Sequence, residues 1–533
     1  MVRLPINESR LIPKQTTITT LSLIGITLLV FSFYYIDYSR PLGGDYMEYF
    51  SKGWFIVKGL RPYVDFWAEK GSFLYMFLAL WIMIFGSAFY SAVTFLVVTT
   101  VLCSFLVYGP AATLGLNRGV CLLSGFLFAF YTSIHQLDPD RDGITVSFAS
   151  IFELLSLIML VWGLSRKKNI YLFLSGFVFT EAVATRQTSL VFIIALIIGI
   201  IYYHGIRAGK TIIKHSFIFA IGVFSAAILF LAYLFLRGAN FQLMWDQLVR
   251  FNVVSARFES AGGSSWIGNR AGIITGSLIL FSSAILTYIV TILAKFIKDR
   301  SISFATCVLL SLLLAHSITI LLSIQAKGYY ALQLIPEASI ITSIVLSEIV
   351  LSRGKDSFSI KLNQVNPKMF EYACVLIMFM IPLAHESILI YTHFKAAIAG
   401  NYLMNSSNIP GYKDDIAVAQ KIREISKNEG DRIWLFQYGH AMIYILSNRY
   451  PAISYTFVNP LDLPGYSDDR IFNDWLVQFQ QNKPKVVVIS PEVEDLGIVP
   501  KIRTVIAANM IKVSSESDVP EIYKWNEAIQ PNP

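Results

Sequence analysis

The chain has 533 residues, of which 55% are hydrophobic and only 15% are charged. Soluble globular domains carry about 25% charged residues, so this composition excludes an ordinary soluble protein and indicates a membrane protein. The formal net charge of +8 does not indicate a nucleic-acid partner, because the basic residues lie in short clusters between apolar stretches, as is typical of membrane topology.

Apolar stretches that approach the length of a bilayer span recur along the chain. A helix needs about 20 apolar residues to cross the hydrocarbon, and a helix satisfies its own backbone hydrogen bonds there. We predict about eleven transmembrane helices, near residues 17–36, 89–109, 118–135, 144–164, 169–184, 187–204, 216–236, 271–295, 303–324, 329–350 and 370–391. The first is predicted to stay uncleaved, because no small-residue cleavage site follows it.

Basic residues orient these helices. With the N-terminus in the cytoplasm, every inner loop contains at least one basic residue. The short outer loops contain few: Arg141, Arg186 and Lys327. We therefore predict a multi-pass protein of the inner (cytoplasmic) membrane with a cytoplasmic N-terminus and an extracytoplasmic C-terminal part.

The apolar segment 72–86 is the exception to this scheme. If it were counted as a span, the basic clusters 166–168 and 207–214 would lie outside. We expect it to be an interfacial or half-inserted helix within a long first outer loop, residues 37–88.

The C-terminal part alternates between helical and strand patterns. Its predicted elements are helices at 414–427, 440–446 and 468–480 and strands at 432–436 and 485–489. The predicted fold is an all-α polytopic membrane domain with interfacial helices over residues 1–391, followed by a small extracytoplasmic α/β domain over 392–533.

Two outer loops collect the acidic residues. The first contains Asp45, Glu48 and the sequence Glu69-Lys70-Gly71, and the second is Asp138-Pro139-Asp140-Arg141-Asp142. Because both loops emerge on the outer side, we predict that Asp45 and the carboxylates of 138–142 share one pocket at the outer membrane surface.

The first outer loop resembles that of a known family. Asp45, followed by aromatic and small residues and then by Gly59-x-x-Pro62-Tyr63-x-Asp65, is similar to the first periplasmic loop of GT-C fold glycosyltransferases. The similar group is the family 39-like one, which includes dolichyl-phosphate-mannose protein mannosyltransferases and bacterial lipid A aminoarabinose transferases. An apolar stretch ending in Phe85-Gly86 follows in the same order, and the segments 175–186 and 434–455 are similar as well.

This resemblance implies a polyprenyl-phosphate-linked sugar donor, an acceptor that is a lipid, glycan or protein on the outer side, and inversion at the anomeric carbon. An attacking acceptor hydroxyl needs a carboxylate to take its proton, and we assign Asp45 to that role. The structural alternative is that Asp45 caps a helix over residues 46–58.

The departing phosphate of the donor requires positive charge nearby. Lys70, Arg186, Arg270 and Lys327 are the candidates, although each is also explained as an anchor at a helix end. The predicted substrate-binding residues are Glu48, Lys70, Asp138, Arg141, Arg186, Arg270, Lys327 and Tyr329.

The second outer loop has two interpretations. Asp140 and Asp142 could take part in catalysis or bind a divalent cation, Mg or Mn, through carboxylate oxygens. Alternatively, one of them caps the helix that begins near Gly143. No other cofactor is indicated.

Two other functions are compatible with the composition. A transporter or flippase of a lipid-linked saccharide would place its polar residues near the membrane midplane on interrupted helices, often in two matching halves. A purely structural subunit would tolerate replacement of Asp45. Acidic outer loops and a folded outer tail favour the glycosyltransferase.

Overall fold

The structure of the chain is a computed structural model, and it describes residues 25, 27, 44–87, 89–135, 144–255, 284–297, 302–322, 334–351, 412–437, 439–514 and 520–528. It forms two compact units, each made of separate stretches of the chain. The first consists of Met1–Asp37, Leu96–Ile228 and Ser264–Ala399, and the second of Tyr38–Phe95, Leu229–Gly263 and Gly400–Pro533. The boundary expected near residue 391 lies outside the described residues and stays a prediction.

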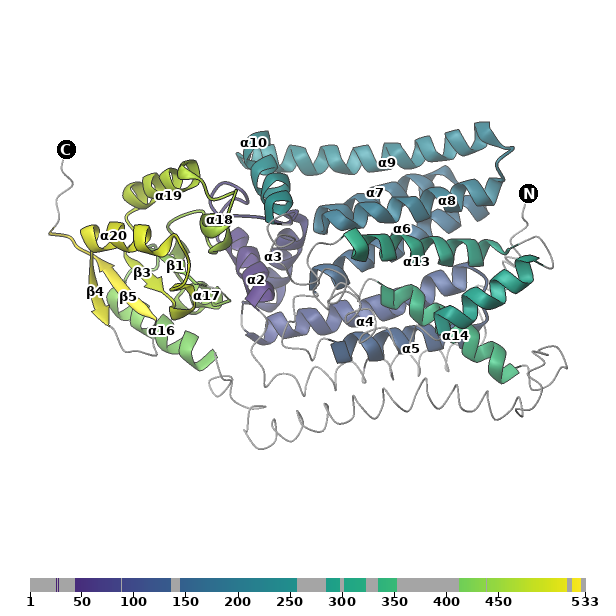
Figure 1. Ribbon diagram of the computed structural model, residues 1–533, viewed down its shortest axis with the longest axis horizontal. Coiled ribbons are helices and arrows are strands. Elements are labelled where there is room, and N and C mark those ends of the chain that lie inside the picture. The colour runs from purple at the N-terminus through teal and green to yellow at the C-terminus, as the bar shows by residue number, and fades with distance from the viewer. Residues whose placement is uncertain are drawn as a thin grey trace. The chain divides into compact units, whose positions relative to one another are not determined.

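The first unit is a bundle of apolar helices. Its members are α5 (Arg118–His135), α6 (Ile144–Arg166), α7 (Asn169–Thr185), the 3-10 turn η2 (Gln187–Phe192), α8 (Ile193–His204), α13 (Phe304–Leu322) and α14 (Ile335–Leu351), together with most of α4 (Phe89–Thr113) and α9 (Gly209–Leu236). Figure 1 shows α6, α7, α8 and α13 side by side. Among the described residues, four segments are long and apolar enough to cross a membrane: Phe89–Thr113, Ile144–Arg166, Gln187–His204 and Gly209–Leu236.

Small residues allow these helices to pack closely. Ser156 of α6 and Ser175 of α7 each donate a hydrogen bond to the other's backbone carbonyl, at 2.9 and 2.8 Å. A Cβ at Gly176 would lie 2.0 Å from the carbonyl oxygen of Phe219 in α9. Close backbone approach at small residues is the usual way in which helices associate in a bilayer.

The helices predicted in the described part of the chain are confirmed as apolar helices, with one local difference. The predicted helix at 187–204 begins with the η2 turn. The reason is the extended backbone of Arg186, with φ −148° and ψ 116°, which ends α7. The predicted helices at 17–36, 271–295 and 370–391 fall mostly or wholly outside the described residues, and the total number of spans stays a prediction.

The second unit contains a small α/β domain with a five-stranded sheet. Its strands are β1 (Arg432–Phe436), β2 (Tyr450–Pro451), β3 (Val486–Ile489), β4 (Met510–Ser514) and β5 (Glu521–Trp525), in the order β2-β1-β3-β5-β4. β1 pairs in parallel with β2 and β3, and β5 pairs antiparallel with β3 and β4. The strands predicted at 432–436 and 485–489 are confirmed.

Helices cover both faces of this sheet. They are α16 (Tyr412–Ile425), α17 (Met442–Ser447), α18 (Asn459–Asp462), α19 (Asp469–Asn482), the 3-10 turn η7 (Pro491–Val493) and α20 (Val499–Asn509). α19 and α20 lie on one face and α16 on the other (Figure 1). Side chains from alternate strand positions, such as Trp434 and Phe436, pack with Trp475 and Phe479 of α19 in the main core.

The segment predicted to be the first outer loop packs against this domain. It contains α2 (Gly44–Val57) and α3 (Phe73–Phe85), and the second unit also includes α10 (Phe241–Trp245) and the π-helical turn η3 (Asp246–Arg250). Trp54 of α2 stacks on Tyr450, and the backbone N–H of Trp67 donates to the carbonyl of Ser454 at 2.7 Å.

The predicted interfacial segment is a helix. α3 has 13 residues, and at about 1.5 Å per residue it is shorter than the roughly 30 Å of hydrocarbon. Three consecutive apolar residues at its C-terminal end, Met83, Ile84 and Phe85, are 70%, 64% and 56% exposed. An exposed apolar end on a short helix is what a half-inserted segment requires.

Candidate active site

One face of α2 carries three charged residues. Asp45, Glu48 and Lys52 occupy positions i, i+3 and i+7 of the helix, a spacing that places side chains on one helix face. Asp45 lies in the first turn, where the positive end of the helix dipole favours a negative side chain. Asp45 and Glu48 are partly buried, and burial, together with the negative charges of Glu69 and Asp45, raises the pKa of Glu48.

Lys52 is the centre of a buried ionic cluster. Its Nζ lies 2.5 Å from Glu48 Oε1 and 2.5 Å from Glu69 Oε2, and the lysine side chain is 0% exposed. The other oxygen of Glu69 accepts a hydrogen bond from Tyr75, at 3.4 Å. The ammonium also lies over the ring of Phe457, 5.0 Å from its centre, an arrangement that stabilises a cation.

The cluster changes how its groups titrate. Burial raises the pKa of Glu48 to about 8, and the charges of Glu69 and Asp45 add to the burial effect while Lys52 opposes it. Burial tends to lower the pKa of Lys52, but its contacts with Glu48 and Glu69 more than offset this, so its pKa is raised. At neutral pH, Lys52 is therefore charged, and Glu48 largely keeps its proton.

The loop that carries Glu69 and Lys70 is held by buried hydrogen bonds. Gln247 accepts from the backbone N–H of Ala68 and donates to the carbonyl of Tyr63, at 2.8 and 2.9 Å. Asn252 donates to the carbonyl of Glu69 at 2.8 Å. These contacts position the backbone beside Lys70, whose side chain is half-buried.

Tyr63 closes this loop from the other side. Its hydroxyl donates to the carbonyl of Lys70 at 3.2 Å and accepts the backbone N–H of Ser72 at 3.1 Å. The residue has φ of +66°, a left-handed conformation that costs energy for a bulky side chain. Two hydrogen bonds and complete burial offset that strain.

The start of α2 is fixed against the α/β domain. A Cβ placed on Gly44 would lie 2.7 Å from the Cα of Gly439, so the two backbones touch. The hydroxyl of Ser51 donates a hydrogen bond to the carbonyl oxygen of Ala441, at 3.0 Å. Asp45 is thus placed beside the segment 439–441.

The structure brings some of the predicted site residues together. Asp45 and Glu48 share the face of α2, and Lys70 belongs to the same compact unit. Arg186 is 5% exposed and belongs to the first unit. The other predicted residues lie outside the described part of the chain: Asp138, Asp140, Arg141, Asp142, Arg270, Lys327 and Tyr329. Their predicted roles, including that of the divalent cation, stay predictions.

A second ionic cluster lies inside the helix bundle of the first unit. His316 Nδ1 is 2.7 Å from Glu337 Oε1, and His316 Nε2 is 3.5 Å from Glu153 Oε2. All three side chains are at most 5% exposed, and they line a small cavity with room for about one water molecule. Among the described residues, no group of three or more His, Cys, Asp or Glu side chains is arranged to hold a metal ion.

The fold itself matches a known structure. The crystal structure of ArnT from Cupriavidus metallidurans in the apo state aligns with a TM-score of 0.60 at 12% sequence identity, covering 95% of this chain and 98% of ArnT. The chain has the ArnT fold. ArnT bound to undecaprenyl phosphate aligns over 96% of this chain and 99% of ArnT, with a TM-score of 0.50 and 12% identity.

The resemblance to aminoarabinose transferases predicted from the first outer loop is thereby confirmed for the fold, since ArnT is such a transferase. No protein-family model matches the sequence, and no curated protein sequence matches it. The similarity to ArnT is therefore one of structure along nearly the whole chain.

Sequence reasoning missed the partners that surround Glu48. Lys52 follows Glu48 at i+4, a spacing typical of a helical ion pair, and this signal was available in the sequence. The contact of Lys52 with Glu69, 17 residues away, depends on how α2 and the loop before α3 pack. His316 and Glu337 were also missed, although charged residues within apolar helices are a functional signal by themselves.

Proposed function

We propose that the protein is an integral membrane glycosyltransferase that moves a sugar from a polyprenyl-phosphate donor to an acceptor. The observation that carries this proposal is the ArnT fold along nearly the whole chain, combined with a carboxylate-bearing helix face at the start of α2. The solved ArnT complex with undecaprenyl phosphate supports a lipid-linked donor.

Asp45 is the proposed general base. It is partly buried in the first turn of α2 and adjoins Glu48, which largely keeps its proton at neutral pH. Of the two carboxyl groups on this face, Asp45 is therefore the one assigned to take the proton of the attacking hydroxyl. Direct attack of that hydroxyl on the anomeric carbon inverts its configuration.

Lys70 is the proposed contact for the donor phosphate in this unit. Tyr63 and Asn252 hydrogen-bond the backbone of residues 69–72, and Gln247 hydrogen-bonds the backbone of residues 63 and 68. These contacts position the backbone of Lys70, whose ammonium is proposed to stabilise the charge that develops on the leaving phosphate. The predicted phosphate contacts Arg186, Arg270 and Lys327 stay predictions, as do the carboxylates of 138–142 as ligands of a divalent cation.

The test is sugar transfer by the full-length protein in detergent or proteoliposomes, with undecaprenyl-phosphate-linked sugars as donors. Asp45→Asn should abolish transfer but leave donor binding intact, whereas Lys70→Ala should weaken donor binding. Asp495→Asn and Lys427→Ala, at exposed positions, are the matched controls and should behave as wild type. Normal transfer by Asp45→Asn removes it as the base.

A transporter of lipid-linked saccharides is the second candidate, because η2 interrupts the helical run from α7 to α8 next to the buried Arg186. Interrupted helices and buried charges are features of carriers. Movement of a fluorescent polyprenyl-linked saccharide across proteoliposomes, without formation of a new glycosidic bond, would favour this function.

A further inference from the structure

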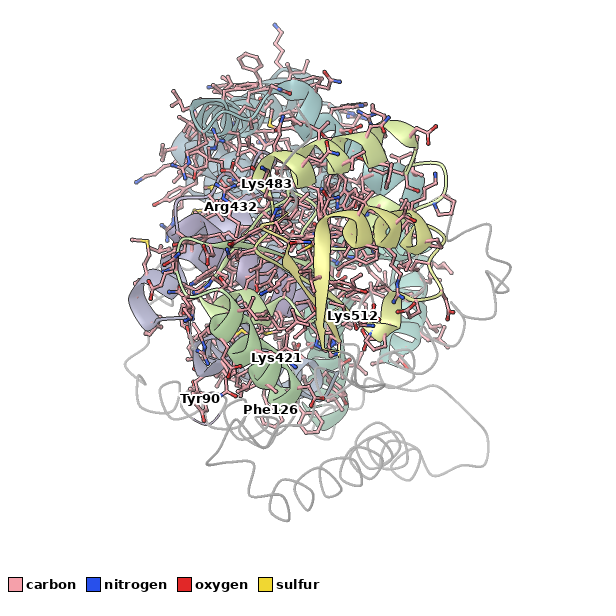
Figure 2. All side chains as sticks on the ribbon, turned by 90° about the vertical axis from the view of Figure 1, so that its left-hand side faces the viewer. Tyr90, Phe126, Lys421, Arg432, Lys483 and Lys512 are labelled. Atoms are coloured by element: carbon pink, nitrogen blue, oxygen red, sulfur yellow. The ribbon has the colours of Figure 1, made fainter. Side chains whose placement is uncertain are left out.

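The parallel part of the sheet contains a topological switch point. From β1 the chain continues to β2 on one side, whereas β3 lies on the other side of β1 and leads on to β4 and β5. Open α/β sheets bind ligands outside the carboxyl ends of the strands, where the order reverses. Arg432, which is labelled in Figure 2, begins β1 and marks the opposite, amino-terminal edge.

Gln437 lies at this carboxyl edge, directly after β1. It is 4% exposed, and neither its Oε1 nor its Nε2 has a hydrogen-bond partner among the described residues. An unsatisfied buried amide costs about 1–3 kcal/mol. The backbone N–H of Ser490 donates to the carbonyl of Phe436, so the strand pairing continues here and alternation places Gln437 on the face opposite Phe436.

His440 lies three residues further on and is oriented by a buried carboxylate. Its Nδ1 is 2.6 Å from Asp415 Oδ1, and Asp415 is 6% exposed. Its Nε2 lies 3.7 Å from Glu492 Oε1, which follows β3. The hydrogen bond with Asp415 raises the pKa of His440 despite its partial burial, and Glu492 acts in the same direction.

This edge adjoins the start of α2. Gly439 lies between Gln437 and His440 and touches Gly44, the neighbour of Asp45. A ligand bound by the carboxyl ends of β1 and β3 is therefore close in space to the proposed base, because Gly44 directly precedes Asp45. That placement suits the acceptor rather than the membrane-bound part of the donor.

The polar groups at the carboxyl edge of β1 and β3 indicate which kind of ligand would bind there. The amide of Gln437 offers a donor and an acceptor, His440 offers a donor, and Glu492 offers an acceptor. Three acidic residues, Asp414, Asp415 and Glu492, surround the single imidazole of His440. Burial raises the pKa of Asp415, and the exposed Asp414 and Glu492 by themselves outnumber the one positive charge of His440. This excess of negative charge disfavours a phosphate and favours hydroxyl groups, which both donate and accept.

We propose that Gln437, His440 and Glu492 form a subsite that binds the hydroxyl groups of a saccharide acceptor, with Asp415 as the positioning residue for His440. Only the assignment of this subsite to the acceptor rests on the proposed function. Binding of the saccharide itself does not depend on transfer.

The test measures binding of three saccharides to the full chain in detergent by saturation-transfer NMR. The saccharides, titrated separately, are methyl glucopyranoside, methyl galactopyranoside and methyl mannopyranoside. At least one should bind, and Gln437→Leu and His440→Leu should each reduce binding about tenfold or more, equivalent to about 1.4 kcal/mol. Gln480→Leu, at an exposed position of α19, is the control. Inorganic phosphate should not compete.

Thermal unfolding separates recognition from a structural role. Because the buried Gln437 amide has no hydrogen-bond partner among the described residues, Gln437→Leu should unfold at the same or a higher temperature than the wild type while losing saccharide binding. Absence of binding by every probe, or equal binding by Gln437→Leu, overturns the subsite. Binding that persists in a protein unable to transfer sugar from polyprenyl phosphate instead contradicts the proposed function and leaves the subsite intact.

Discussion

The ammonium of Lys52 lies 2.5 Å from a carboxylate oxygen of Glu69, and the two side chains are 0% and 8% exposed. This ion pair joins the middle of α2 to the loop that carries Lys70. The same helix presents Asp45 two turns earlier. The proposed base and the proposed phosphate contact are therefore linked through one buried contact.

Removal of Lys52 should be strongly destabilising. Lys52→Met leaves the buried carboxylate of Glu69 without its cation, and breaking a buried ion pair on one side costs about 3–5 kcal/mol. Chemical unfolding of the purified protein measures the change, with Lys427→Met at an exposed position as the control. A change in Lys52→Met no larger than in the control would show that the cluster is not buried in solution.

The stability of the protein should depend on pH through Glu48. Its pKa is 4.5 in its ordinary state and about 8 in the folded protein, so the folded state holds a proton that the unfolded chain has lost. The contribution of this group to the free energy of unfolding therefore falls as the pH rises from about 4.5 to about 8.

Glu48→Gln tests this dependence, because a glutamine cannot ionise. The variant should lose less stability than the wild type between about pH 5 and about pH 8, as measured by thermal unfolding at each pH. Glu424→Gln, on the exposed side of α16, should retain the wild-type dependence. An unchanged slope in Glu48→Gln would contradict the raised pKa.

Gln247 should affect donor binding without touching the donor. Gln247→Leu leaves the N–H of Ala68 and the carbonyl of Tyr63 unsatisfied, at about 1–3 kcal/mol for each buried group. We expect lower stability and a weaker affinity for undecaprenyl phosphate, because the loop before Lys70 loosens. Donor titration of Gln247→Leu and Lys70→Ala, singly and together, should give non-additive losses; fully additive losses would contradict the link.

The sequence allowed most of the fold to be predicted, because helix and strand periods are local. α5, α6 and α7 follow from apolar runs, and β1 and β3 from short apolar segments with polar flanks. Close contacts between distant segments could not be predicted, since nothing in the pattern of α2 shows that Gly44 touches Gly439 or that Lys52 reaches Glu69. Asp45 and Glu48 were predicted from the resemblance, whereas Gln437 has no local signal at all.

The last prediction concerns the cluster of His316, Glu153 and Glu337 in the helix bundle. His316→Leu removes the group between Glu153 and Glu337, whose side chains are 3% and 1% exposed, and should destabilise the protein by about 3–5 kcal/mol. Glu337→Gln should cost less, because its amide oxygen still accepts the Nδ1–H of the imidazole at the same place. Thermal unfolding in detergent ranks the two variants, with Glu424→Gln at an exposed position of α16 as a comparison. Equal stability of His316→Leu and Glu337→Gln would contradict the role of the imidazole as the partner of two buried carboxyl groups.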